Sequence, residues 1–205
     1  MDAQFSRCWR AIGARNDDAA ARVAACWSEP HRHYHNREHL EECLGWLEAA
    51  RAFAARPHEL AVALYFHDAV YDPARTDNEA ASAQLFAELA HTAGIGEDVV
   101  TRIRALISST ARHDGEHGDT ALLSDIDLSI LGAAPARYAR FERDIRREYA
   151  RYDDEHYRRG RAAVLSLFLS RFAIYKTPFF ARLEAQARDN LAHALRALAQ
   201  APASD

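Results

Sequence analysis

The stretch Leu60-Ala61-Val62-Ala63-Leu64-Tyr65-Phe66-His67-Asp68-Ala69-Val70-Tyr71 is almost wholly apolar apart from one His-Asp pair. Pro57 precedes it and Pro73 follows it, so the pattern predicts one buried helix between the two prolines. A carboxylate that is buried without a partner destabilises the fold. A divalent metal ion would neutralise the pair, because imidazole nitrogen and carboxylate oxygen are natural metal ligands. We therefore expect His67 and Asp68 to share an ion with ligands from other helices.

The composition is that of an ordinary soluble globular protein. The chain has 205 residues, of which 49% are hydrophobic and 27% are charged, and this length suffices for one domain with a sizeable core. The net charge of −4 argues against a nucleic-acid partner and against binding to an anionic membrane surface. We expect a single domain over residues 1–200 and a disordered tail at residues 201–205.

We expect neither a secretory leader nor a membrane-spanning segment. The first residues are polar, and no apolar stretch is long enough to span a bilayer. Cys8, Cys26 and Cys43 show no metal-binding or redox spacing, and each lies next to apolar residues at helical spacing. We interpret them as small core residues in a reducing compartment, which predicts a cytoplasmic protein.

Glycine and proline are few and fall between segments with helical periodicity, and no segment alternates in the manner of a strand. The pattern therefore predicts an all-α, single-domain helical bundle. The expected helices span residues 4–27, 37–55, 57–72, 78–93, 97–110, 120–131, 135–159, 160–174 and 178–200.

Two further clusters could complete a metal site. Four of the 11 histidines lie between His31 and His39, and His39 opens a helix whose Leu40 and Leu44 are expected to face the core. The second cluster is the Asp125-Ile126-Asp127 segment, in which two acids interrupt an apolar helix. At 100° per residue, Asp127 lies about 70° from the centre of the apolar face and Asp125 about 130°. Asp127 is therefore the better ligand, although Asp125 stays an alternative.

The ordered set of motifs resembles the HD-domain superfamily of metal-dependent phosphohydrolases, and more closely a branch of small predicted HD hydrolases. That superfamily has an early His, a central His-Asp pair and a late Asp, all on helices. The resemblance covers residues from about 20 to about 195. The matching segments are residues 34–40, 66–72, 77–79 and 125–132.

The resemblance implies the hydrolysis of a small-molecule phosphoester, commonly a nucleotide. It implies a divalent ion bound by His39, His67, Asp68 and Asp127, and Mn²⁺, Fe²⁺, Mg²⁺, Ni²⁺ and Zn²⁺ all suit this ligand set. Such an ion lowers the pKa of a bound water and offsets charge on the phosphoryl group. Asp68 would thus belong to the catalytic site as well as to the metal site.

Other residues are expected to assist catalysis or to bind substrate. Asp72 lies four residues after Asp68, on the same face of the expected helix, and Asp72 or Glu79 could orient or deprotonate the water. The candidate substrate-binding residues are Arg32, His35, His113 and Lys176. Arg32 and His35 lie near the motifs, His113 lies in the polar loop at residues 111–120, and Lys176 is the only lysine in the chain.

Three alternatives stay open at this point. His35-Asn36-Arg37-Glu38-His39 also fits the H-x-x-E-H motif of zinc proteases, with Glu38 as the base. The fold could instead bind a nucleotide or a metal without turnover, as a regulatory module. A purely structural helical protein is the third alternative. The sequence leaves the oligomeric state open, and a homo-oligomer is compatible with it.

Overall fold

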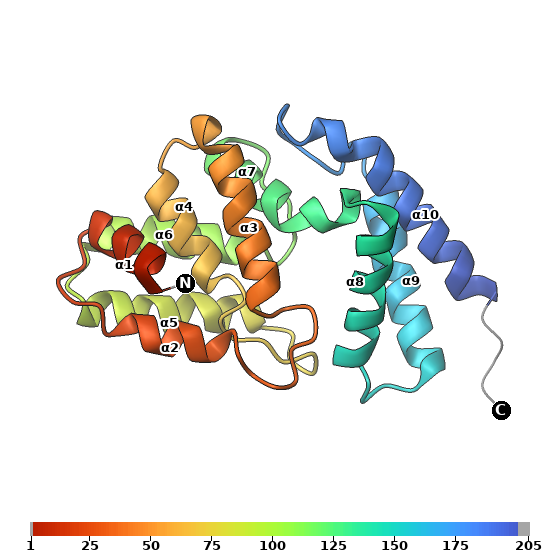
Figure 1. Cartoon of the computed structure of the whole chain (residues 1–205), viewed down its shortest axis with the longest axis horizontal. Helices are drawn as coiled ribbons and strands as arrows, with labels where there is room; N and C mark the ends of the chain where they lie inside the picture. The colour runs from red at the N-terminus through yellow and green to blue at the C-terminus, as the bar shows by residue number, and fades with distance from the viewer. Residues whose placement is uncertain (1, 201–205) are drawn as a thin grey trace.

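The computed structural model describes residues 2–200, and every regular element in that range is a helix, as the sequence predicted (Figure 1). The elements in chain order are α1 (Asp2–Ala11), α2 (Ala19–Cys26), α3 (Arg37–Ala49), η1 (Arg51–Phe53), α4 (Pro57–Phe66), α5 (Asn78–Thr92), α6 (Glu97–Ser109), α7 (Gly118–Asp127), η2 (Leu128–Gly132), α8 (Pro135–Glu148), α9 (Asp154–Ser170), η3 (Ala181–Leu183) and α10 (Glu184–Gln200).

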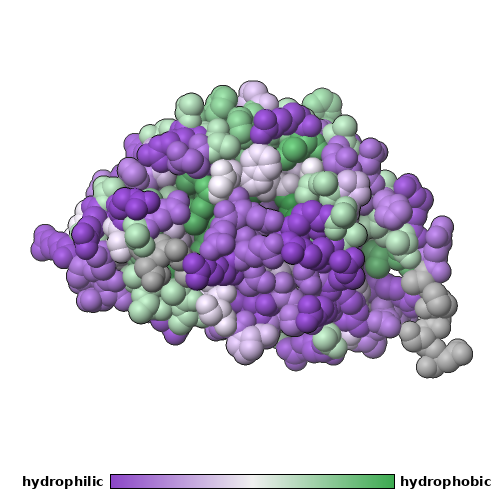
Figure 2. All heavy atoms as spheres, viewed as in Figure 1, coloured by the Kyte–Doolittle hydropathy of each residue, from purple (hydrophilic) through white to green (hydrophobic). Residues whose placement is uncertain are grey.

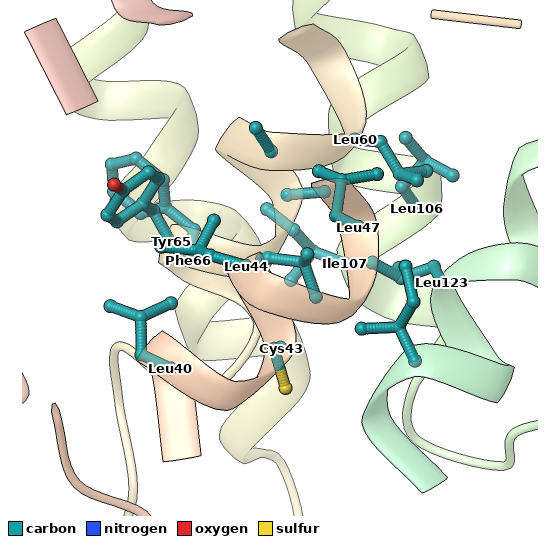
Figure 3. Close-up of a cluster of buried hydrophobic side chains, with 14 of the residues drawn as sticks. Leu40, Cys43, Leu44, Leu47, Leu60, Tyr65, Phe66, Leu106, Ile107 and Leu123 are labelled. Carbon is teal, nitrogen blue, oxygen red and sulfur yellow. The ribbon is translucent and has the colours of Figure 1, made fainter. Parts of the chain in front are cut away.

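Helix α4 is the centre of the larger half of the molecule. Its residues from Leu60 to Phe66 are all buried, and it packs against α1, α3, α5, α6 and α7. A helix that is apolar on all sides can be stable in water only when it is enclosed in this way. Figure 3 shows side chains from α3, α4, α6 and α7 meeting between these helices, among them Leu44, Leu47, Phe66 and Ile107.

Helices α8, α9 and α10 form the second half, beside the first (Figure 1). The short helix η2 connects the halves and packs against both α8 and α10. The apolar core continues into this half through Phe141, Ile145, Leu165 and Leu191. Hydrophilic residues dominate the middle of the face that Figure 2 shows. Cys8, Cys26 and Cys43 are buried and unpaired, which agrees with their predicted place in the core.

Several predicted helix boundaries are wrong. The expected helix at 4–27 is two helices, because the chain breaks at Gly13, whose φ of 105° lies in the left-handed region that glycine adopts without strain. The expected boundary at residue 160 lies instead at residues 149–153. Asp153 begins α9 there, because its carboxylate accepts a hydrogen bond from the backbone N–H of His156 at 2.8 Å.

The most consequential difference concerns α4, which ends at Phe66 rather than at residue 72. His67 is its C-cap, and Asp68 lies in the turn that follows. The helices expected at 37–55, 120–131 and 178–200 also end or begin in separate short 3₁₀ turns, whereas those at 78–93 and 97–110 are confirmed to within one residue at each end. The expected disordered tail lies outside the described residues. Within residues 2–200, none of the helices has the length and apolar composition that a membrane span requires.

Candidate metal centre

Four predicted ligands converge at one point between α3, α4 and α7. His39 lies in the first turn of α3, His67 and Asp68 follow the last turn of α4, and Asp127 ends α7. One ligand atom from each of the four lies within 4.8 Å of all the others, so this group could hold a metal ion. The structure therefore brings together residues that are up to 88 positions apart because three helix ends meet.

The distances suit a common ion. The Nε2 atom of His67 lies 3.0 Å from Oδ2 of Asp68 and 3.3 Å from Nε2 of His39. Oδ1 of Asp127 lies 3.2 Å from the His39 nitrogen and 3.5 Å from the His67 nitrogen. With metal–ligand bonds of about 2.1 Å, neighbouring ligand atoms are expected about 3.0 Å apart around an octahedral ion and about 3.4 Å apart around a tetrahedral one.

The hydrogen bonding of His67 also fits a metal ligand. Its Nδ1 lies 2.8 Å from the backbone carbonyl of Leu64, which only accepts, so Nδ1 carries the proton. In the neutral ring, Nε2 then directs a lone pair at the carboxylates of Asp68 and Asp127, and only a cation or a second proton relieves this repulsion. Burial lowers the pKa of His67, but the two carboxylates outweigh it and hold the pKa well above its usual value. A divalent ion would supply the same positive charge, so the residues present fit a metal.

His113, a predicted substrate-binding residue, contacts Asp127 from the loop before α7. Its Nε2 lies 2.8 Å from Oδ2 of Asp127, which leaves the other carboxylate oxygen facing His39 and His67. The loop is held by Arg171, which donates to the carbonyls of Arg112 at 2.8 Å and of His113 at 2.9 Å. His113 therefore orients Asp127.

Arg32, a predicted substrate-binding residue, is committed to other groups of the chain in this structure. Its side chain is fully buried, because its guanidinium donates to the backbone carbonyls of His35, Asp68 and Ala69 at 3.0, 2.7 and 3.1 Å. It also pairs with Glu29 at 2.8 Å. Arg32 therefore fixes the turn that presents Asp68 rather than a ligand in the cavity.

Lys176 and Asp125 lie together on the other side of α7. The ammonium of Lys176 pairs with Glu116 at 3.1 Å, and Lys176 is not among the residues that line the cavity at the centre. Asp125 is fully buried, and its carboxylate accepts hydrogen bonds from the backbone N–H groups of Lys176 and Thr177. Asp125 thus anchors the segment after α9, and Asp127 is the acid that reaches the centre.

The two candidate bases occupy different places. The argument that Asp72 shares a helical face with Asp68 is wrong, because α4 ends before both residues. Asp72 is exposed, and its carboxylate accepts from the backbone N–H of Ala74 at 2.8 Å. Glu79, in the first turn of α5, is half-buried and lines the cavity. Its carboxylate has no ion pair within the described range, and of the two candidates Glu79 is the one that lines the cavity.

His35 lines the same cavity and is held by Glu148. Its Nδ1 lies 2.7 Å from the Glu148 carboxylate, which also accepts from the hydroxyl of Tyr71 at 2.8 Å and from three backbone N–H groups at residues 33–35. Burial raises the pKa of Glu148, but the hydrogen bonds and charge of His35 outweigh it and bring the pKa to about 2. Burial lowers the pKa of His35, but Glu148 and Asp68 outweigh it and raise that pKa above its usual value.

The protease alternative requires Glu38 to face the same ion as His35 and His39. Instead, Glu38 lies at the surface and pairs with Arg140 of α8. Nδ1 of His35 is occupied by Glu148, and His35 does not belong to the group of ligand atoms at the centre. The structure therefore gives no support to the zinc-protease motif.

A cavity of about 1080 Å³ opens from the metal centre toward α8 and α9. Asp68 and Asp127 line it, together with His35, Glu79 and His113. The sequence did not point to Arg112 or Tyr34, which also line it. The position of Arg112 next to His113 could have indicated that it lines the site. No feature of the sequence indicated Tyr34, whose hydroxyl is buried without a hydrogen-bond partner.

Comparisons of the chain with protein-family models, with curated proteins and with solved structures returned no match. The site must therefore be interpreted from its own geometry.

Proposed function

We propose that this protein is a metal-dependent phosphohydrolase of the HD type that cleaves a small phosphoester. The observation that carries the proposal is the group of His39, His67, Asp68 and Asp127, whose ligand atoms meet at the end of a cavity large enough for a small organic substrate. Two neutral and two anionic ligands would leave positions on the ion for water and for a phosphate oxygen.

When bound, a divalent ion such as Mn²⁺, Fe²⁺, Mg²⁺, Ni²⁺ or Zn²⁺ would polarise the phosphoryl group and lower the pKa of a water molecule. Residues of the chain would accept the water proton and bind the phosphate. We assign Glu79 as the acceptor of the water proton, because it is half-buried on the cavity wall. We assign Arg112 to the phosphate, since it lines the cavity and its guanidinium has no ion-pair partner in residues 2–200.

His113 and Arg32 have positioning roles in this proposal. His113 holds one oxygen of Asp127, and Arg32 holds the backbone of Asp68. Residues that orient metal ligands in this way commonly affect metal affinity and activity by about 10–100-fold. Because the three cysteines are unpaired and buried, we place the activity in a reducing compartment, the cytoplasm.

The test is phosphate release from a panel of monoesters, diesters and nucleoside triphosphates, with each candidate metal in turn. Wild type should turn over at least one ester, Asp68→Ala should not, and Asp72→Ala should serve as the matched control because its carboxylate lies outside the cavity. Binding of nucleotides without turnover above the Asp68→Ala background would favour a regulatory module. Peptide cleavage that is lost in Glu38→Ala would favour the protease.

A further inference from the structure

We infer that the substrate is a phosphomonoester of an apolar alcohol, whose organic part lies along α9. The inference rests on the proposed phosphohydrolase function and concerns the part of the cavity away from the metal centre. It follows from two features of the cavity wall, namely how its basic side chains are paired and which residues of α9 it exposes.

The basic side chains on the wall are nearly all neutralised within the chain. The pairs are Arg75 with Asp77, Arg161 with Glu142, His156 with Asp153, His113 with Asp127 and His35 with Glu148. Among the lining residues that the structure describes, Arg112 is the one arginine whose guanidinium has no acidic partner. The wall can therefore match one phosphoryl group beside the metal, whereas the extra charges of a diphosphate or triphosphate would lack partners.

Three of the hydrogen-bonding side chains on the wall are committed within the chain. The hydroxyl of Tyr71 donates to Glu148 at 2.8 Å, and that of Thr110 donates to the carbonyl of Ile107 at 2.8 Å. The amide of Asn78 donates to the carbonyl of Asp72 at 2.9 Å. These three side chains are not free to bond the hydroxyl groups of a sugar phosphate, whereas the hydroxyl of Tyr34 has no partner and could accept one such contact.

The second half of α9 lines the cavity with apolar side chains that are incompletely covered. Val164, Leu165, Leu167 and Phe168 line it, and Leu165 is the one buried residue of α9 in the described chain. Val164 is 42% exposed and Leu167 is 59% exposed. Apolar side chains that line a cavity but stay open to water gain stability when an apolar ligand covers them. An alkyl or aryl group on the phosphate would do so.

A series of straight-chain alkyl phosphates from two to eight carbons tests the inference, with a sugar monophosphate, a nucleoside monophosphate and a nucleoside triphosphate for comparison. The wild-type protein with Mn²⁺ should show kcat/KM rising about two- to fourfold for each methylene that enters the cavity. The rise in kcat/KM should come mainly from a lower KM. A flat series, or a preference for the sugar phosphate or a nucleotide, would overturn the inference.

Two variants locate the effect. Leu167→Gln should flatten the chain-length series, and the loss for the longest ester should be about 5–10-fold with little change for the shortest. Phe53→Gln is the matched control, because Phe53 is 54% exposed but does not line the cavity, and it should keep the wild-type slope. A slope in Leu167→Gln equal to that of wild type would show that the chain does not lie on α9.

The outcomes separate this inference from the proposed function. Hydrolysis without chain-length dependence overturns the inference and leaves the function standing. If no ester is hydrolysed above the Asp68→Ala background, the proposed function fails, and calorimetric titration with alkylphosphonates decides the inference. Affinity that rises with chain length then supports it, and equal affinity along the series overturns it.

Discussion

The guanidinium of Arg32 donates a hydrogen bond to the backbone carbonyl of Asp68 at 2.7 Å, across 36 positions of sequence. The same side chain bonds the carbonyl of Ala69 at 3.1 Å, and its guanidinium lies 5.6 Å from the ring centroid of Trp27 and 5.5 Å from that of Tyr71. This contact holds the turn after α4 in the conformation that brings Asp68 to His39 and Asp127.

Arg32→Lys should destabilise the protein and lower its metal content together. Lysine keeps the charge but cannot bond three carbonyls from one planar group, so we expect a loss of about 2–4 kcal/mol in the free energy of unfolding. Denaturant unfolding measures it. Arg37→Lys is the control, because Arg37 forms an exposed pair with Glu41, and it should change stability by less than about 0.5 kcal/mol. If Arg32→Lys is as stable as wild type, Arg32 does not hold the turn that presents Asp68.

Asp127 and Asp125 should separate metal binding from folding. Asp127→Ala should abolish the rise in melting temperature that added metal produces, because it removes a ligand. Asp125→Ala should keep that rise but lower the starting temperature, since it leaves the N–H groups of Lys176 and Thr177 without an acceptor, at about 1–3 kcal/mol. Thermal unfolding with and without Mn²⁺ measures both effects. If Asp125→Ala loses the metal-induced rise in melting temperature and Asp127→Ala keeps it, Asp125 is the ligand.

Glu148 should make stability depend on pH in the acid range. Its pKa is about 2 in the folded protein against an ordinary value of 4.5, so its contribution is complete above pH 4.5 and is lost as the pH falls toward 2. The difference corresponds to about 3 kcal/mol. Glu148→Gln should be less stable than wild type at pH 7. The difference between their free energies of unfolding should become smaller as the pH falls from 5 to 2. Urea unfolding at several pH values measures it, and a constant gap would contradict the assignment.

Glu79 and Asp72 should differ in their effect on turnover. Glu79→Gln should lower kcat by about 10²-fold or more while leaving the metal content unchanged, because it removes a proton acceptor but no ligand. Asp72→Asn should keep most of the activity, since the Asp72 carboxylate bonds a backbone N–H outside the cavity. Steady-state kinetics on the best ester provides the comparison. A larger loss in Asp72→Asn would restore Asp72 as the base.

The sequence predicts the parts of this structure that depend on local pattern. Apolar periodicity and the prolines predict an all-helical fold, and the burial of His67-Asp68 in an apolar run predicts a neutralising partner. The start of α9 could also have been predicted, because Asp153 followed by Asp154 and Glu155 is typical of a helix N-terminus.

Other features depend on contacts that are distant in the sequence. No glycine or proline marks the end of α4 at Phe66, and the turn that follows is held by Arg32. Asp125 is buried because a segment some fifty residues later covers it. A helical wheel of α7 alone has no information about that segment, so it placed Asp125 farther from the apolar face than Asp127 and left its role open.

The central claim is that four side chains hold one metal ion, and elemental analysis tests it most directly. Protein purified without chelator should contain about one equivalent of a divalent metal or more, and His39→Ala and His67→Ala should each lose most of it. His31→Ala is the matched control, because His31 lies in the same sequence cluster but contacts the carbonyl of Tyr71 instead. If His39→Ala and His67→Ala retain as much metal as wild type and His31→Ala, the metal centre is not where this account places it.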